Sequence, residues 1–152
     1  MPKNTRVLGV VIGGALAIGP VARAEVVAAQ SAPSFEMAQG RGQATLLLNE
    51  KTGSPEAALS RLSLQPGAQV PEHVHEGSAE FLYVMSGEMT LVLDGQKQVL
   101  RAGDAVRIPA GHKHAGQVAA SGPRVELVQI YVGPGPEARF RTGKPITPPS
   151  KP

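Results

Sequence analysis

Short apolar runs separated by turns that contain glycine or proline are the feature that most restricts how this chain can fold. The pair Asp94-Gly95 is a typical two-residue hairpin turn, and Pro66-Gly67 and Ser86-Gly87 end two other runs. Runs this short and this regularly interrupted are typical of antiparallel sandwiches and barrels, so we predict an all-β chain. A helical turn over 56–61 is the one alternative to a strand. The predicted strands cover 45–49, 59–64, 81–85, 89–93, 98–101, 106–108 and 125–132.

The size and composition fit one globular domain. The 152 residues lie within the usual range for a single domain, and 41% of them are hydrophobic. This fraction is too high for a disordered chain, and 18 glycines with 14 prolines are too many for a helical bundle. Because the chain contains no cysteine, disulfides and cysteine-ligated metal sites are excluded.

The first 24 residues predict an export signal. Lys3 and Arg6 precede an apolar stretch over 7–22, and Ala22-Arg23-Ala24 is a small-x-small cleavage site. The alternative is a membrane anchor, but the stretch is shorter than the roughly 20 residues that a spanning helix needs. We therefore expect cleavage after residue 24, export to the periplasm or the medium, and no stable membrane span in the mature chain.

The net charge of the mature chain argues against polyanionic partners. The whole chain has 15 basic and 12 acidic side chains, a formal charge of +3. Lys3, Arg6 and Arg23 belong to the export signal, so 12 basic and 12 acidic groups are left. A protein that binds nucleic acid would need to retain a basic patch, so we expect no nucleic-acid partner.

Composition divides the mature chain into three segments. Residues 25–42 are rich in Ala, Gln, Ser, Gly and Pro and are expected to form a flexible lead-in. Residues 43–132 hold the predicted strands and are expected to form the β-barrel domain. Residues 133–152 are expected to be an extension that ends in a proline-rich tail, because proline cannot donate to a strand ladder.

A group of metal-binding residue types is set among the turns. His73 and His75 are two residues apart, so on an extended segment both side chains point to the same face. Four residues then allow a reversal before Glu80, which would return its carboxylate to the imidazoles. His114 follows the turn Pro109-Ala-Gly111 and would add a third imidazole if its strand pairs in the same sheet.

Three imidazoles and one carboxylate predict one divalent transition metal. This donor set suits Fe, Mn, Ni, Cu, Co or Zn and disfavours Ca and Mg, which prefer oxygen ligands. Four protein ligands would leave about two positions of an octahedral ion open for substrate, oxygen or water.

The same residues resemble the cupin superfamily. Its first motif is Gly, five residues, His-x-His, three or four residues, Glu, six residues and Gly. Its second motif is Gly, five residues, Pro-x-Gly, two residues, His, three residues and Asn. The chain matches the first with Gly67, His73, His75, Glu80 and Gly87, and the second with Gly103, Pro109, Gly111 and His114. It departs only at the last position, where Val118 stands in place of Asn.

The resemblance implies a double-stranded β-helix, a jelly-roll-like barrel, with His73, His75, Glu80 and His114 around one metal. It points to small exported cupins similar to quercetin dioxygenases, which bind an organic substrate at the metal, and it suggests a homodimer formed through strand edges. Related cupins act as isomerases, decarboxylases or lyases. A non-catalytic module that binds a small molecule and a barrel with a purely stabilising metal are the two other functions that the sequence leaves open.

For other polar residues the sequence gives weaker support for a functional role. His112 is expected at the barrel mouth because it directly follows the Pro-x-Gly turn. Gln129 could face the cavity and bind a ligand, or it could be solvated. Arg139 and Arg141 could fold back over the barrel, but their spacing does not decide it.

Overall fold

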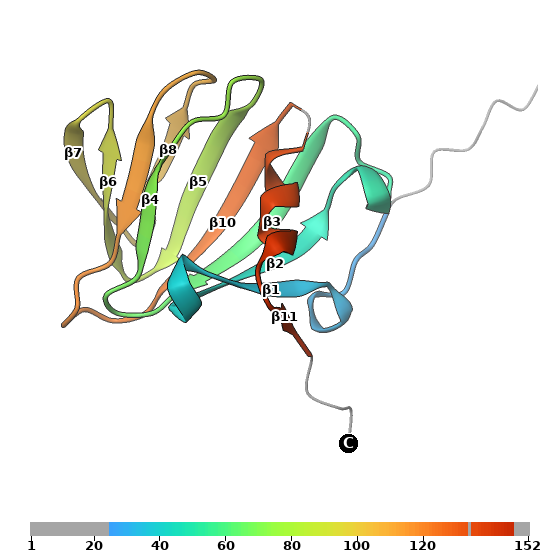
Figure 1. Cartoon of the computed structure of the whole chain (residues 1–152), viewed down its shortest axis with the longest axis horizontal. Coiled ribbons are helices and arrows are strands. Elements are labelled where there is room, and N and C mark those ends of the chain that lie inside the picture. The colour runs from blue at the N-terminus through green and yellow to red at the C-terminus, as the bar shows by residue number, and fades with distance from the viewer. Residues whose placement is uncertain (1–24, 134, 148–152) are drawn as a thin grey trace, which may run out of the picture.

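The protein folds into two antiparallel sheets that face each other (Figure 1). A computed structural model describes residues 25–133 and 135–147. The larger sheet has seven strands in the order β11-β1-β2-β3-β10-β5-β8, and the smaller has four in the order β4-β9-β6-β7. The prediction of an all-β fold is thus confirmed.

The strand bounds agree with the turn pattern, and every sequence-predicted strand is present. In the larger sheet the strands are β11 (Pro145–Ile146), β1 (Ser34–Met37), β2 (Gly42–Leu48), β3 (Ala57–Leu64), β10 (Val125–Val132), β5 (Ala79–Ser86) and β8 (Ala105–Ile108). In the smaller sheet they are β4 (Gln69–His73), β9 (His114–Gln117), β6 (Glu88–Leu93) and β7 (Gln96–Arg101). The 3-10 turns are η1 (Ala29–Ser31), η2 (Ala38–Gly40), η3 (Glu50–Thr52) and η4 (Pro136–Thr142).

The structure is more ordered at both ends of the barrel than composition indicates. Residues 34–37, within the stretch expected as a flexible lead-in, form β1 and pair with β2. Residues 145–146, within the expected tail, form β11 and pair with β1. Pro145 fits there because β11 is an edge strand that pairs on one side only, so one missing donor is tolerated. Residues 57–64 are a strand, so the helical alternative for 56–61 does not occur.

The predicted export signal over 1–24 lies outside the described residues, as do residues 148–152 of the tail. Within the part that the structure describes, none of the helices has the length and apolar character needed to cross a membrane.

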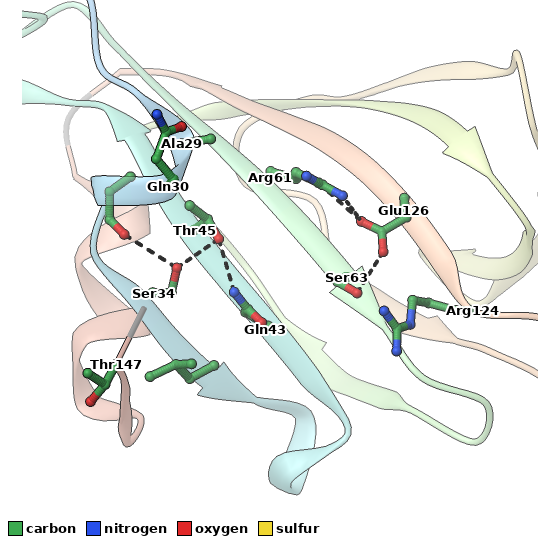
Figure 2. Close-up of a pocket in the computed structure, with 12 residues that line it drawn as sticks. Ala29, Gln30, Ser34, Gln43, Thr45, Arg61, Ser63, Arg124, Glu126 and Thr147 are labelled. Atoms are coloured by element: carbon green, nitrogen blue, oxygen red, sulfur yellow. Dashed lines mark hydrogen bonds and ion pairs between the residues drawn. The ribbon is translucent and has the colours of Figure 1, made fainter. Parts of the chain in front are cut away.

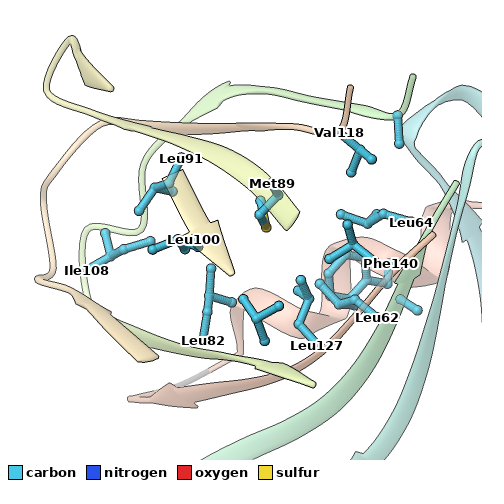
Figure 3. Packing of buried hydrophobic residues seen from close by; sticks show 14 of the residues in the cluster. Leu62, Leu64, Leu82, Met89, Leu91, Leu100, Ile108, Val118, Leu127 and Phe140 are labelled. Atoms are coloured by element: carbon cyan, nitrogen blue, oxygen red, sulfur yellow. The ribbon is translucent and has the colours of Figure 1, made fainter. Parts of the chain in front are cut away.

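The core lies between the two sheets. Strand alternation is clearest in β10, where every second side chain is buried from Val125 to Tyr131. Figure 3 shows side chains of both sheets pointing toward one another, with Met89 and Leu91 of β6 on one side. Phe140 of η4 joins the same cluster, so the segment after β10 is packed against the barrel.

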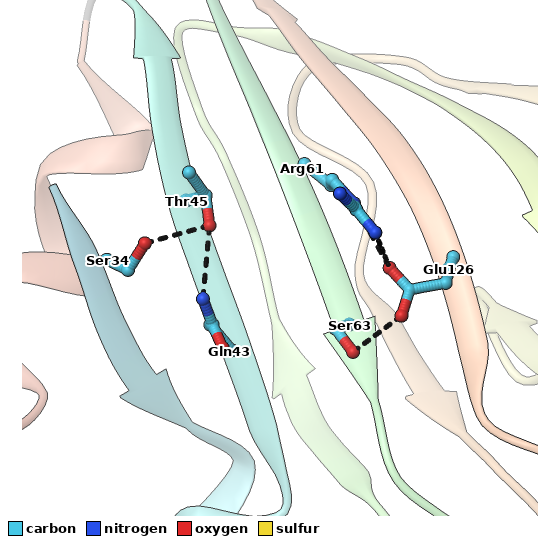
Figure 4. Close-up of polar contacts among 6 residues, drawn as sticks. All are labelled: Ser34, Gln43, Thr45, Arg61, Ser63 and Glu126. Carbon is cyan, nitrogen blue, oxygen red and sulfur yellow. Dashed lines mark hydrogen bonds and ion pairs between the residues drawn. The ribbon is translucent and has the colours of Figure 1, made fainter. Parts of the chain in front are cut away.

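The outer face of the larger sheet carries a polar row (Figures 2 and 4). The Arg61 guanidinium donates to the Glu126 carboxylate, which also accepts a 2.8 Å hydrogen bond from the Ser63 hydroxyl. Ser34 and Thr45 share a 2.9 Å hydroxyl contact further along. These groups line a surface hollow of about 530 Å³. Since they face away from the barrel interior, this hollow is separate from the buried histidines.

Two turn glycines offer a matched test of backbone crowding. Gly87 (φ +81°) and Gly95 (φ +80°) both have left-handed backbones. A Cβ atom at Gly87 would lie 2.6 Å from the Arg124 carbonyl oxygen, whereas a Cβ at Gly95 would meet nothing within 4 Å. We expect Gly95→Ala to lower the free energy of unfolding by about 1–2 kcal/mol. Gly87→Ala should cost about 1–3 kcal/mol more, because the β5–β6 turn must move. Urea unfolding of both variants measures the difference, and equal losses would contradict the crowding at Gly87.

Candidate metal centre

Four side chains from both sheets meet inside the barrel. His73 ends β4 and is the direct cross-strand partner of His114 at the start of β9, so these two imidazoles lie side by side in the smaller sheet. His75 follows two residues after His73. Glu80 projects from β5 of the larger sheet, where it pairs between Tyr131 and Ile108. One potential ligand atom from each of the four residues lies within 4.8 Å of every other.

The turns of the smaller sheet hold the ligand loops in place. The Asp94 carboxylate accepts hydrogen bonds from the backbone N–H of Lys113 and from Nδ1 of His112, at 3.2 and 2.6 Å. The Gly111 N–H donates to the His75 carbonyl at 2.9 Å. The hairpin and the Pro-x-Gly turn thus fix the two loops that carry His75 and His114 relative to each other.

Backbone carbonyls set the tautomers of two histidines. Nδ1 of His73 lies 2.8 Å from the Pro71 carbonyl, and Nδ1 of His114 lies 3.0 Å from the His112 carbonyl. A carbonyl oxygen only accepts, so each Nδ1 must carry the hydrogen. In the neutral rings Nε2 is then a free lone pair aimed into the cluster, which is how metal-ligating histidines are usually arranged.

The buried ligand atoms of the cluster need a cation between them. His114 Nε2 lies 2.8 Å and His75 Nε2 lies 3.4 Å from Glu80 Oε2. Within residues 25–133 and 135–147 these atoms have no hydrogen-bonding partner beyond the cluster itself. A neutral imidazole lone pair and a carboxylate oxygen repel at such a distance, so a proton or a metal ion must lie between them. Donors bound to one ion at about 2.1 Å can be at most about 4.2 Å apart, so small side-chain adjustments would suffice.

The electrostatics of the cluster favour neutral His73 and ionised Glu80. Burial, together with the charge of Arg139, lowers the pKa of His73 to about 4. Burial would raise the pKa of Glu80, but hydrogen bonds from His114 and His75, when a proton is on Nε2, and from Gln129 outweigh it and lower that pKa to about 2. For His114, burial alone would lower the pKa, yet the contact with Glu80 raises it. The carboxylate therefore attracts positive charge to this point.

Two residues of β10 contact members of the cluster. Gln129 is 2% exposed and its amide donates to Glu80 Oε1 at 2.5 Å, so of its two alternatives the interior one is correct. The ring of Tyr131 packs edge-on against the His75 imidazole, with centroids 4.9 Å apart. Burial, with a smaller effect of the Glu80 charge, raises the pKa of the Tyr131 hydroxyl, which stays protonated. Tyr131 was not predicted as a site residue, although it shares strand parity with Gln129.

His112 and Arg139 lie in different places relative to the cluster. His112 is exposed and pairs with Asp94, so its side chain lies away from the four ligand candidates. Arg139, whose position the sequence left undecided, does fold back over the barrel. It lines a cavity of about 30 Å³ together with His73, Glu80 and His114. The rest of the cavity wall is mainly apolar, including Leu62, Leu82, Leu91 and Leu127.

Comparison with known proteins agrees with this geometry. Residues 60–131 match the cupin domain family. TcmJ, a tetracenomycin polyketide synthase protein of Streptomyces glaucescens, is 27% identical over 130 residues, which cover 85% of this chain and 86% of that protein. Quercetin 2,3-dioxygenase of Bacillus subtilis is 36% identical over 76 residues, which cover 50% of this chain but 23% of that enzyme. The crystal structure of a cupin protein from Bacteroides fragilis is 30% identical with a TM-score of 0.52, covering 59% of this chain and 75% of that one.

The chain is a member of the cupin superfamily and contains a single small cupin domain. The barrel is the one that the resemblance implied, and its His/Glu cluster could hold a metal ion.

Proposed function

We propose that the protein is a metal-dependent, dioxygenase-like enzyme that acts on a small organic substrate. The observation that carries the proposal is the buried convergence of three imidazole Nε2 atoms and the Glu80 carboxylate on one point. Likeness to a quercetin dioxygenase and to a polyketide synthase protein supports a small organic substrate.

His73, His75, Glu80 and His114 would hold one divalent transition metal. The donor set fits such an ion because all three histidine nitrogens and the carboxylate oxygen are buried and otherwise without partners among the described residues. A bound ion of this kind supplies Lewis acidity, open coordination positions and, for redox-active metals, electron exchange with dioxygen.

The surrounding residues prepare the site for that chemistry. Carbonyl contacts at Nδ1 keep the Nε2 atoms of His73 and His114 directed inward. Gln129 holds one oxygen of Glu80, so the other is left to face the imidazoles. The leucines of the cavity wall give the cluster a mainly apolar surrounding, which strengthens charge interactions inside.

Elemental analysis and oxygen uptake test the proposal. Purified protein should contain about one transition metal per chain, and it should consume oxygen when supplied with a flavonol or a β-diketone. Metal-loaded protein that binds these compounds without consuming oxygen would instead be a non-catalytic binding module. Protein that takes up no metal would contradict the proposal altogether.

His75→Ala should abolish metal loading, with a loss of affinity of at least about 100-fold, because it removes one of four donors. His112→Asn is the matched control, because that histidine is exposed and an asparagine amide can still donate to the Asp94 carboxylate that anchors this loop. Metal titration of both variants measures the effect. Full metal occupancy in the His75 variant would show that the site is assigned wrongly.

Gln129→Leu should lower metal affinity by about 10–100-fold, as loss of an orienting hydrogen bond to a ligand does. The substitution leaves Glu80 Oε1 unpaired and free to rotate. Gln117→Leu, at an exposed position of β9, serves as the control. If both glutamine variants bind Co(II) as tightly as the parent, the Gln129 amide does not orient Glu80.

We further propose that the chain is exported and that Glu25 is the mature N-terminus. Terminal sequencing of protein recovered from the periplasm or medium should start at Glu25, because cleavage is expected after Ala24. Recovery of chains that retain Met1 in the membrane fraction would contradict this. The homodimer implied by the cupin resemblance stays a prediction, and light scattering can test it.

A further inference from the structure

Arg139 stands where the buried cluster meets the surface. It comes from η4, the 3-10 turn that follows β10 and returns over the barrel (Figure 1). Arg139 and His73 line both the small cavity at the cluster and a more open hollow of about 310 Å³. The hollow also has Glu72 of β4 and Phe140 on its wall. It is therefore the approach to the cluster, and Arg139 borders that approach.

The guanidinium of Arg139 has few contacts for a half-buried charge. It reaches the Tyr131 hydroxyl only at 3.5 Å and lies near the Phe140 ring. Within 25–133 and 135–147 no carboxylate forms an ion pair with it. Glu137 of the same turn is buried but is not its partner. Most of the five N–H donors of an arginine are thus available to a ligand.

The charge balance selects the kind of ligand. With a divalent ion bound, the single carboxylate of Glu80 and three neutral imidazoles leave an excess positive charge, and Arg139 adds to it. The hollow is also lined by the carboxylates of Glu36 and Glu72, but each has a lysine ammonium 3.9 Å away that offsets its charge. A planar guanidinium recognises carboxylates and similar oxyanions through two parallel hydrogen bonds.

We propose that Arg139 is a substrate-binding residue that makes this site select small molecules with an anionic oxygen, a carboxylate or an ionised hydroxyl. The proposal rests on the metal-dependent function proposed above and names its substrate class. The ligand lies in the hollow with its anionic group between Arg139 and the cluster. The family match ends at residue 131, so this selectivity would be added by a segment outside it.

A matched pair of probes tests the role of Arg139. Benzoate and benzamide have nearly the same shape but differ in charge, and their binding to Co(II)-loaded protein can be followed by the visible spectrum of the ion. Arg139→Gln should weaken benzoate binding by about tenfold or more, the usual effect of losing a charge-assisted hydrogen bond. It should leave benzamide binding and Co(II) affinity nearly unchanged. Arg139→Lys should recover part of the benzoate affinity relative to Arg139→Gln, because lysine keeps the positive charge but cannot make two parallel hydrogen bonds.

Arg141→Gln is the control variant. Arg141 belongs to the same turn but lies over the Phe35 ring and lines neither the cavity nor the hollow. Its loss should leave both probes unaffected. Equal benzoate affinity in Co(II)-loaded parent and Arg139→Gln would overturn the role of Arg139 while leaving the metal site intact. Failure of the parent to bind Co(II) would overturn the proposed function, and this inference with it.

Discussion

The organisation of the barrel interior depends on one buried negative charge, the carboxylate of Glu80. Glu80 is 3% exposed and lies among leucines, where an uncompensated carboxylate would be costly. Gln129 satisfies one oxygen, and the other faces imidazole nitrogens that carry no fixed charge in their neutral form. Positive charge must therefore be supplied at the cluster by a proton or a metal ion. The low-dielectric setting makes that requirement strong, and the inward-facing Nε2 atoms make a metal the better fit.

The same charge links the site to the closure of the barrel. Three of the four groups belong to the smaller sheet and the loop that follows β4, whereas Glu80 comes from β5 of the facing sheet. These three are His73 at the end of β4, His75 in that loop and His114 at the start of β9. No pair of neighbouring strands in either sheet contains the complete set. The site forms only when the sheets pack together, so a metal that binds the folded chain would stabilise that packing by mass action. With no cysteine in the chain, such a metal would be the one cross-link available between the sheets.

The sequence was most informative where local rules apply and least where distant contacts decide. Turn chemistry predicted seven of the eleven strands that the structure describes, and strand parity together with the family motif predicted the His/Glu cluster. Parity could not distinguish an interior Gln129 from a solvated one, because that depends on which face of β10 packs against the smaller sheet. The pairing of 34–37 with 145–146 joins segments more than 100 residues apart, and neither has a strand-like composition. Its stability comes from Phe35 and Phe140 joining the core.

The position of η4 indicates how a His/Glu cluster of the cupin type could acquire its own ligand preference. The four donors and the turns that hold them lie within residues 60–131, the part that cupins share. The approach to the cluster is bordered partly by Glu72 and His73 from within that region and partly by side chains from either side of it, Met37 of β1 and Arg139 of η4. Substitutions in these flanking segments can change charge and shape at the approach without disturbing Glu80 or the imidazoles. Under the proposed role of Arg139, the core of the barrel would fix the chemistry that is possible, and the flanking segments would select the molecule that reaches it.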